Sequence, residues 1–191
     1  MGRLILTNNQ QNHQLIVKKF LEGGIKKNMH FSAGNFEVTS FRKITDLENK
    51  NSVKYSNGDF ICICGTFIYK YKTGKDAINE VYSAFSGDVT KLQNDILGNY
   101  SCVLKKDEII YIFTDREGIQ KLYYQDVPES IVISQDLSKI ACVIKEISIN
   151  ELALLEASFQ YSNLDNHTMF NEIKLLRGNE YLSINVKKKF Y

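Results

Sequence analysis

The sequence predicts an α+β fold, in which antiparallel β-sheets pack together and helices cover them from outside. Strand-like segments outnumber helix-like ones, and they follow one another as hairpins instead of alternating with helices, which is typical of antiparallel sheets. The composition, 43% hydrophobic and 12% aromatic over 191 residues, is sufficient to bury a core. Because no linker rich in proline or glycine divides the chain, we expect residues 1–191 to form one domain.

Two helices are expected in the first half of the chain. One follows a short strand at residues 3–7, lies within residues 8–24 and ends at Gly23-Gly24. The other covers residues 75–85, by the spacing of its apolar positions. In the first helix, the same spacing predicts that the core-facing side chains are Leu15, Ile16, Phe20 and Leu21.

Three regions are β-like. Residues 30–44 are β-like throughout, and residues 52–71 place the hairpin signal Asn57-Gly58 between two strand runs. Residues 100–115 are expected to form a hairpin, with a charged tip at 105–108. These regions supply most of the sheet that the fold class requires.

The last third contains two further strands and one helix. The strands are expected at residues 130–136, after the single proline Pro128, and within residues 180–191. The helix is expected within residues 147–160, with Ser148 or Asn150 as its N-cap. We expect its inward stripe to include Leu154, Leu155 and Phe159, beside an edge at Phe190-Tyr191.

Charge and hydropathy exclude two classes of partner. The net charge of +2 results from 24 basic and 22 acidic residues, which gives no basic face for nucleic acid. The basic run Lys187-Lys188-Lys189 is interpreted as a solvated tail. The sequence has no run of 18 apolar residues and no secretory signal layout, so we expect a cytoplasmic protein without membrane contact.

The cysteines and histidines do not indicate a metal site. Cys62 and Cys64 alternate with isoleucines in a strand-like run, so both thiols should point to one face. Neither they nor the other cysteines, Cys102 and Cys142, have metal-ligand spacing to His13, His30 or His167. We therefore expect reduced thiols that pack as small apolar side chains.

Known catalytic and nucleotide-binding motifs are absent from the sequence. It has no phosphate-binding glycine loop, no serine-hydrolase elbow and no zinc-protease motif. Asp76 and Glu80 are four residues apart on a helix, a spacing typical of a solvated helix face. Asp115 and Arg116 are adjacent in a turn, where such residues satisfy backbone groups more often than they catalyse a reaction.

Seven segments, taken together, resemble a known family in their order and approximate spacing. They are GTFIYK at 65–70, TGKDAINEVYSAF at 73–85, ILGNYSCVL at 96–104, FTDREGIQKLYY at 113–124, IVISQDLSKI at 131–140, INELALLEASFQY at 149–161 and HTMFNEIKLLRGNEYLSI at 167–184. The series resembles the N-terminal, class II glutamine amidotransferase-like domain of asparagine-synthetase-like proteins. This resemblance covers about two-thirds of the chain. It implies an αββα sandwich of the Ntn-hydrolase type.

The resemblance assigns a structural role to the turn that follows the third hairpin. In the family this segment turns one strand back and packs aromatic side chains against the second half of the domain. The matching residues here are Asp115, Arg116, Gly118, Tyr123 and Tyr124. We expect a positive φ at Gly118.

The resemblance also implies a glutamine pocket that has lost its chemistry. Active members use an N-terminal cysteine, which supplies both the nucleophilic thiol and the α-amine base; here Gly2 follows Met1. The family's Asn-Gly-Glu, which forms the oxyanion hole and holds the substrate amine, matches Cys64, Gly65 and Thr66. The pocket aspartate matches Asp76, and the arginine that pairs with the substrate carboxylate matches Arg42. No catalytic residue is therefore expected.

The expected function is that of a glutaminase-silent domain beside an amide-forming synthetase. No Ser-Gly-Gly-x-Asp-Ser loop is present, so ATP and magnesium are expected only on a synthetase domain in cis or in trans. Relatives without the cysteine include β-lactam synthetases and lasso-peptide cyclases. One alternative is a module in which Arg42 and Asp76 bind an amino acid or a peptide end. Another is an enzyme in which cleavage makes Cys62 or Cys64 N-terminal.

Overall fold

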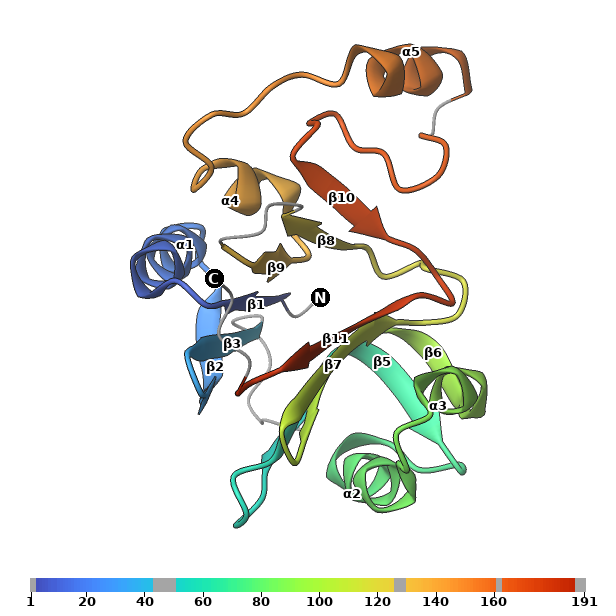
Figure 1. Cartoon of the computed structure of the whole chain (residues 1–191). Coiled ribbons are helices and arrows are strands. Elements are labelled where there is room, and N and C mark those ends of the chain that lie inside the picture. The colour runs from blue at the N-terminus through green and yellow to red at the C-terminus, as the bar shows by residue number, and fades with distance from the viewer. Residues whose placement is uncertain (1–2, 43–50, 126–129, 161–162, 188–191) are drawn as a thin grey trace.

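The computed structural model describes residues 3–42, 51–125, 130–160 and 163–187. Two antiparallel sheets run through these residues (Figure 1). The six-stranded sheet A has the order β10-β8-β9-β1-β3-β2, and the five-stranded sheet B has the order β11-β7-β6-β5-β4. The strands are β1 (Arg3–Thr7), β2 (Lys26–Ala33), β3 (Phe36–Arg42), β4 (Ser52–Lys54), β5 (Phe60–Tyr69), β6 (Ile96–Lys106), β7 (Ile109–Thr114), β8 (Leu122–Gln125), β9 (Val132–Ser134), β10 (Ile173–Leu176) and β11 (Tyr181–Asn185). The helices are α1 (Gln10–Glu22), α2 (Gly74–Ala84), α3 (Val89–Asp95), α4 (Leu137–Ala141) and α5 (Glu151–Gln160).

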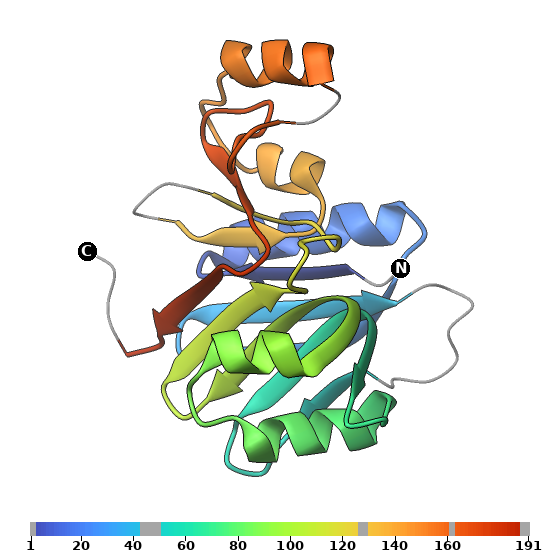
Figure 2. The same ribbon diagram turned by 90° about the vertical axis from the view of Figure 1, so that its right-hand side faces the viewer.

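Four layers are joined by three apolar interfaces. The central interface lies between the sheets and contains Leu6 and Val38 from sheet A and Cys62 and Val103 from sheet B. Helices α1 and α4 pack on the outer face of sheet A, and helices α2 and α3 pack on the outer face of sheet B, as Figure 2 also shows. The predicted α+β class and the αββα sandwich are therefore confirmed.

Most of the expected elements are present. The Asn57-Gly58 turn joins β4 to β5, and Gly58 has a φ of 84°. Asn150 caps α5, because its Oδ1 accepts a hydrogen bond of 3.1 Å from the backbone N–H of Ala153. Two short helices, α3 and α4, were not predicted from the sequence. Each is seven residues or fewer, too short for a 3.6-residue pattern to be recognised.

The predicted apolar stripe of α1 is partly wrong. The buried residues are His13, Ile16 and Phe20, whereas Leu15 is 41% exposed and Leu21 47% exposed. Positions 13, 16 and 20 follow the i, i+3, i+7 spacing of one helix face. His13 thus occupies a core-facing position. Because the prediction used apolar residues alone, the predicted face of α1 is rotated relative to the face that contacts the sheet.

The predicted inward stripe of α5 is also wrong for this chain. Leu154, Leu155 and Phe159 are all exposed, Phe159 to 84%, and only Ala153 of this helix is buried. Figure 1 shows α5 at the top of the molecule, beyond α4 and β10 and away from both sheets. The expected edge at Phe190-Tyr191 lies outside the described residues.

Among the helices that the structure describes, none combines the length and apolar character needed to cross a membrane.

Candidate functional site

The start of β1 lies near the strands that carry Arg42 and Cys64, two of the residues matched to the glutamine pocket. Leu4 in β1 pairs with Ser40 near the end of β3, and in the facing sheet Cys64 in β5 pairs with Ser101 in β6. The Ser40 hydroxyl contacts the Cys62 thiol across the interface. The start of β1 therefore lies opposite the middle of β5.

Gln135, which follows β9, connects the two sheets at this point. Its Oε1 accepts a hydrogen bond of 2.7 Å from the backbone N–H of Leu4, and its Nε2 donates to the Ser101 hydroxyl. The Cys64 thiol also contacts the Gln135 side chain. Gln135 is only 6% exposed, and this side-chain amide satisfies the buried polar groups around it.

Cys64 is placed as a core residue. It lies between the sheets in the same interface as Cys62, as the alternation in the sequence predicted. The hydrogen bond that the Cys64 thiol donates to Cys62 and the burial of the side chain together raise the pKa of the Cys64 thiol well above its usual value. Cys102 is buried too, whereas Cys142 is exposed, so the expectation of buried thiols is wrong for Cys142.

Gly65 has a structural reason to be glycine. Its φ is 116°, and a Cβ at this position would lie 2.1 Å from the carbonyl oxygen of Asn99. Gly98 on the neighbouring strand shows the same close approach, with a φ of 120° and a Cβ position 2.2 Å from the carbonyl oxygen of Thr66. The Gly65 carbonyl accepts a hydrogen bond of 3.0 Å from the Asn51 side chain. The two glycines let β5 and β6 approach closely at this point.

Thr66 and Asp76 are both exposed, and they lie on different elements. Thr66 follows Cys64 by two positions in β5, so both side chains project from the face turned toward sheet A. Asp76 lies in the first turn of α2, which packs on the opposite face of sheet B. Its neighbour Glu80 forms ion pairs with Lys70 and Lys72. Within the described ranges, no hydrogen bond or ion pair links Thr66 or Asp76 to Cys64.

Arg42, the last residue of β3, lies beyond Ser40 on the face turned toward sheet B. Its Nε atom is buried and has no hydrogen-bond partner among the residues that the structure describes. A buried guanidinium nitrogen without a partner is costly, because it has lost its hydrogen bonds to water. Gly2, which the resemblance matches to the family's nucleophile, lies outside the described residues.

The Asp115 turn carries the chain from one sheet to the other. The Asp115 carboxylate accepts hydrogen bonds of 2.9 and 2.8 Å from the backbone N–H groups of Ile119 and Gln120. Gly118 has a φ of 62°, as expected, and its N–H donates to the Asp115 carbonyl. The Arg116 side chain is exposed and lies 4.0 Å from the Glu117 carboxylate. The Asp115 side chain therefore satisfies backbone N–H groups of the turn, as the sequence predicted.

A second connection lies against this turn. The chain passes from sheet B to sheet A between β7 and β8, and it returns between β10 and β11. A Cβ on Gly118 would lie 2.9 Å from the backbone nitrogen of Gly178, and a Cβ on Gly178 would lie 2.2 Å from the carbonyl oxygen of Arg116. The two crossings are therefore in backbone contact, and glycine is required on both sides.

Tyr123 and Tyr124, the paired tyrosines after the turn, pack in two different apolar interfaces. Tyr123 packs with the residues beneath α1 and α4, and Tyr124 packs into the interface between the sheets. Burial raises the pKa of the Tyr123 hydroxyl. This opposite orientation follows from the two-residue period of β8.

His13 and His30 lie side by side, a contact that the sequence spacing did not predict. The His13 and His30 rings are 5.3 Å apart, between α1 and β2, and His30 Nε2 lies 2.6 Å from a Glu37 carboxylate oxygen. Over the described part of the chain, no group of three His, Cys, Asp or Glu side chains could hold a metal ion. His167, by contrast, lies 3.4 Å from Glu156.

Comparison with known proteins identifies the fold. No protein-family model and no curated protein matches the sequence. Among solved structures, the chain is similar to a glutamine phosphoribosylpyrophosphate amidotransferase from B. subtilis complexed with ADP and GMP, with a TM-score of 0.54 and 8% identity. It is also similar to an allosteric regulatory enzyme of purine biosynthesis, with a TM-score of 0.56 and 8% identity. Each match covers 100% of this chain and 50% of the other. The chain therefore has the Ntn-hydrolase fold of class II glutamine amidotransferases and spans half the length of the structures it matches.

Proposed function

We propose that the chain is a glutaminase-silent, glutamine-amidotransferase-like domain that serves as scaffold and interface for an ATP-dependent, amide-forming partner. The partner is a synthetase domain of the asparagine-synthetase-like class, in cis or in trans, of the kind found in lasso-peptide cyclases and β-lactam synthetases. ATP and magnesium belong to that partner. The observation that supports the proposal is the Gln135 bridge, whose internal hydrogen bonds join Leu4 to Ser101 beside Cys64, the residue that the resemblance matches to the family's oxyanion donor.

The chemistry of a glutaminase of this fold needs groups that the chain does not supply. The first residue must provide both a nucleophile and an amine base, and Gly2 provides no nucleophile. The oxyanion needs donors aimed at it. At the position of the asparagine donor stands the Cys64 thiol, a weak donor that already contacts Cys62 and Gln135. Thr66 offers no carboxylate to a substrate amine.

We expect no ammonia release from glutamine by the parent chain or by Gly2→Cys. Restoring the thiol leaves the oxyanion without its donor, and the loss of one such donor lowers the rate about 100- to 1000-fold. The triple variant Gly2→Cys, Cys64→Asn, Thr66→Glu is the smallest set for which we expect detectable turnover. Ammonia and glutamate are measured, with removal of Met1 verified by intact mass.

The single variant is the matched control for the triple one. Turnover by the parent would contradict the silent-domain proposal. Substantial turnover by Gly2→Cys alone would show that the oxyanion hole does not lie at Cys64. Intact mass also tests the alternative in which cleavage makes Cys62 or Cys64 N-terminal, a cleavage that would remove β1 to β4.

The surface around α5 supports the interface role. A helix that is apolar on all sides is normally buried, and extended apolar patches mark interaction sites. Helix α5 and its flanking segments expose Ile147, Ile149, Leu152, Leu154, Leu155, Phe159, Leu164 and Met169. Since α5 projects away from both sheets (Figure 1), these side chains are available to a partner and contribute little to the domain's own core.

We expect the chain alone to self-associate through this surface at high concentration. The variant Leu155→Glu, Phe159→Glu places charges in the apolar patch and should shift sedimentation toward the monomer without lowering the melting temperature. Leu15→Glu, at an exposed leucine of α1, is the matched control and should leave association unchanged. A parent chain that stays monomeric at high concentration would contradict this interpretation of α5.

A second candidate function is an amino-acid or peptide-binding module. The observation that favours it is the buried Arg42 Nε without a partner in the described residues, since a bound carboxylate would satisfy such a group. Calorimetry with glutamine and other amino acids separates the two proposals. A scaffold gives no heat, whereas a binding module gives a saturable signal that Arg42→Ala abolishes.

A further inference from the structure

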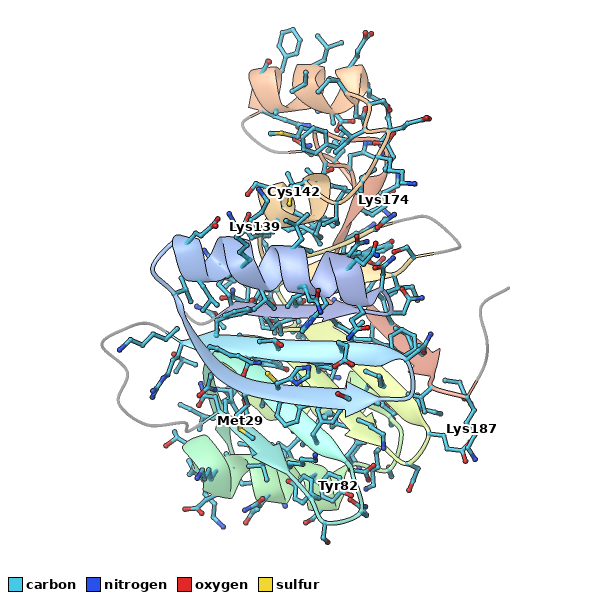
Figure 3. All side chains as sticks on the ribbon, turned by 90° about the vertical axis from the view of Figure 1, so that its left-hand side faces the viewer. Met29, Tyr82, Lys139, Cys142, Lys174 and Lys187 are labelled. Carbon is cyan, nitrogen blue, oxygen red and sulfur yellow. The ribbon has the colours of Figure 1, made fainter. Side chains whose placement is uncertain are left out.

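A groove of about 570 Å³ lies on the outer face of sheet A, away from the Gln135 bridge. Helix α1 covers β1 and β3 through His13, Ile16 and Phe20, and leaves the edge strand β2 beside it (Figure 3). Its lining includes His13, Val17, Leu21, Lys27, His30 and Glu37. Its volume is in the range of small-molecule sites.

The register of the β2–β3 hairpin explains why polar groups gather here. Lys27 pairs with Phe41 and His30 with Thr39, on the face that α1 covers. The groove floor is thus a polar strip on a sheet face that elsewhere packs against α1 with apolar side chains. A purely structural gap between a helix and an edge strand has no need of two imidazoles side by side.

Hydrogen bonds fix both imidazoles and leave one nitrogen of each available. His13 Nε2 lies 2.9 Å from the Thr39 hydroxyl, and His30 Nε2 lies 2.6 Å from Glu37. The Glu37 carboxylate also accepts a hydrogen bond of 2.8 Å from Ser32. Within the described residues, Nδ1 of His13 and Nδ1 of His30 have no hydrogen-bond partner, so both can contact a ligand.

The charged groups around the two histidines indicate the charge of the ligand. Lys27 acts electrostatically on His13, and it has no ion-pair partner among the described residues. Glu37 is already bound by His30 and Ser32. One uncompensated ammonium beside two imidazoles favours an anion. The carboxylates of Glu22 and Glu37 in the same lining oppose a multiply charged one.

We propose that this groove binds a small monocarboxylic acid with an apolar body. The carboxylate lies against Lys27, His13 and His30, and the apolar body lies on Val17 and Leu21. Leu21, 47% exposed on α1, then contacts the ligand instead of water. The site is separate from the proposed glutaminase-silent pocket, since it is on the other face of sheet A.

The test is a titration of the ¹⁵N-labelled chain, followed by amide NMR shifts, with phenylacetate and hexanoate as probes. We expect saturable amide shifts at residues 13, 17 and 30. Phenylacetamide, the uncharged analogue, should bind about tenfold more weakly than phenylacetate, because a hydrogen bond to a charged group is about twice as strong as one between neutral groups. Lys27→Ala should weaken phenylacetate binding at least about fivefold. Lys26→Ala, one residue away on the opposite face of β2, is the matched control and should not change it.

Several outcomes would overturn the proposal. These are no saturable shift with either acid, equal binding of acid and amide, tighter binding of inorganic phosphate, and equal effects of Lys27→Ala and Lys26→Ala. Both lysines are exposed on the edge strand, so both variants are expected to fold, and dispersed amide spectra verify this. Glutaminase assays do not report on the groove, so failure here leaves the proposed function untouched.

Discussion

Gly65→Ala is expected to destabilise the domain severely. The new Cβ would lie 2.1 Å from the Asn99 carbonyl oxygen, a backbone atom that cannot move without separating β5 from β6. The φ of 116° adds backbone strain of about 1 to 3 kcal/mol. Together with overpacking of about 1 to 3 kcal/mol, this loss is a large part of the roughly 5 to 15 kcal/mol that stabilises a domain.

Gly24→Ala is the matched control for this variant. Gly24 also has a positive φ, of 78°, but a Cβ there meets nothing within 4 Å. The difference in unfolding free energy between the two variants therefore measures the clash with β6, apart from most of the backbone strain. Equal stability of the two variants in urea titration would show that the strands separate at no cost.

Gly65 has a packing role that explains why a glycine stands at this position of the family motif. The resemblance assigns Gly65 to an oxyanion hole, together with Cys64 in place of an asparagine. The close approach of Asn99 and the matching Gly98 give Gly65 a structural role that is independent of catalysis. Its presence is therefore not evidence of residual glutaminase chemistry, and this agrees with the proposal of a silent pocket.

The layers of the fold were predictable from the sequence because they depend on local signals. Two-residue alternation marks β5, and the Asn57-Gly58 turn sets its hairpin with β4. The apolar spacing of α2 agrees with its buried Ala77, Ile78 and Val81. The stripe of α1 could not be predicted in this way, since His13 faces the core and its imidazole is satisfied by Thr39 on a distant strand.

The centre of the candidate site was beyond sequence reasoning. Gln135 is 131 residues from Leu4, whose N–H it accepts, and 34 residues from Ser101. Gln135 lies in the matched segment IVISQDLSKI, but neither its spacing nor its residue type indicates these partners, and only the packing of the two sheets brings the three residues together. The contact between His13 and His30 is a second example, because it depends on where α1 crosses the β2–β3 hairpin.

Gly118→Val is expected to be severely destabilising, because two independent costs act at one position. A β-branched side chain at a φ of 62° is strained by about 1 to 3 kcal/mol. Its Cβ would also lie 2.9 Å from the backbone nitrogen of Gly178, in the return crossing between the sheets. Since 1 kcal/mol shifts the melting temperature of a domain of this size by about 2 to 4 °C, we expect a decrease of roughly 5 to 15 °C.

Gly58→Val separates the two costs. Gly58 has a φ of 84° in the β4–β5 turn, and a Cβ there meets nothing within 4 Å, so this variant carries the backbone strain without the contact. Calorimetry of both variants should show a larger decrease for Gly118→Val. A Gly118→Val protein that melts within a degree or two of the parent would contradict the structural role of the Asp115 turn. The two sheets would then not depend on the backbone contact between their crossings, and that contact is what the glycine pair allows.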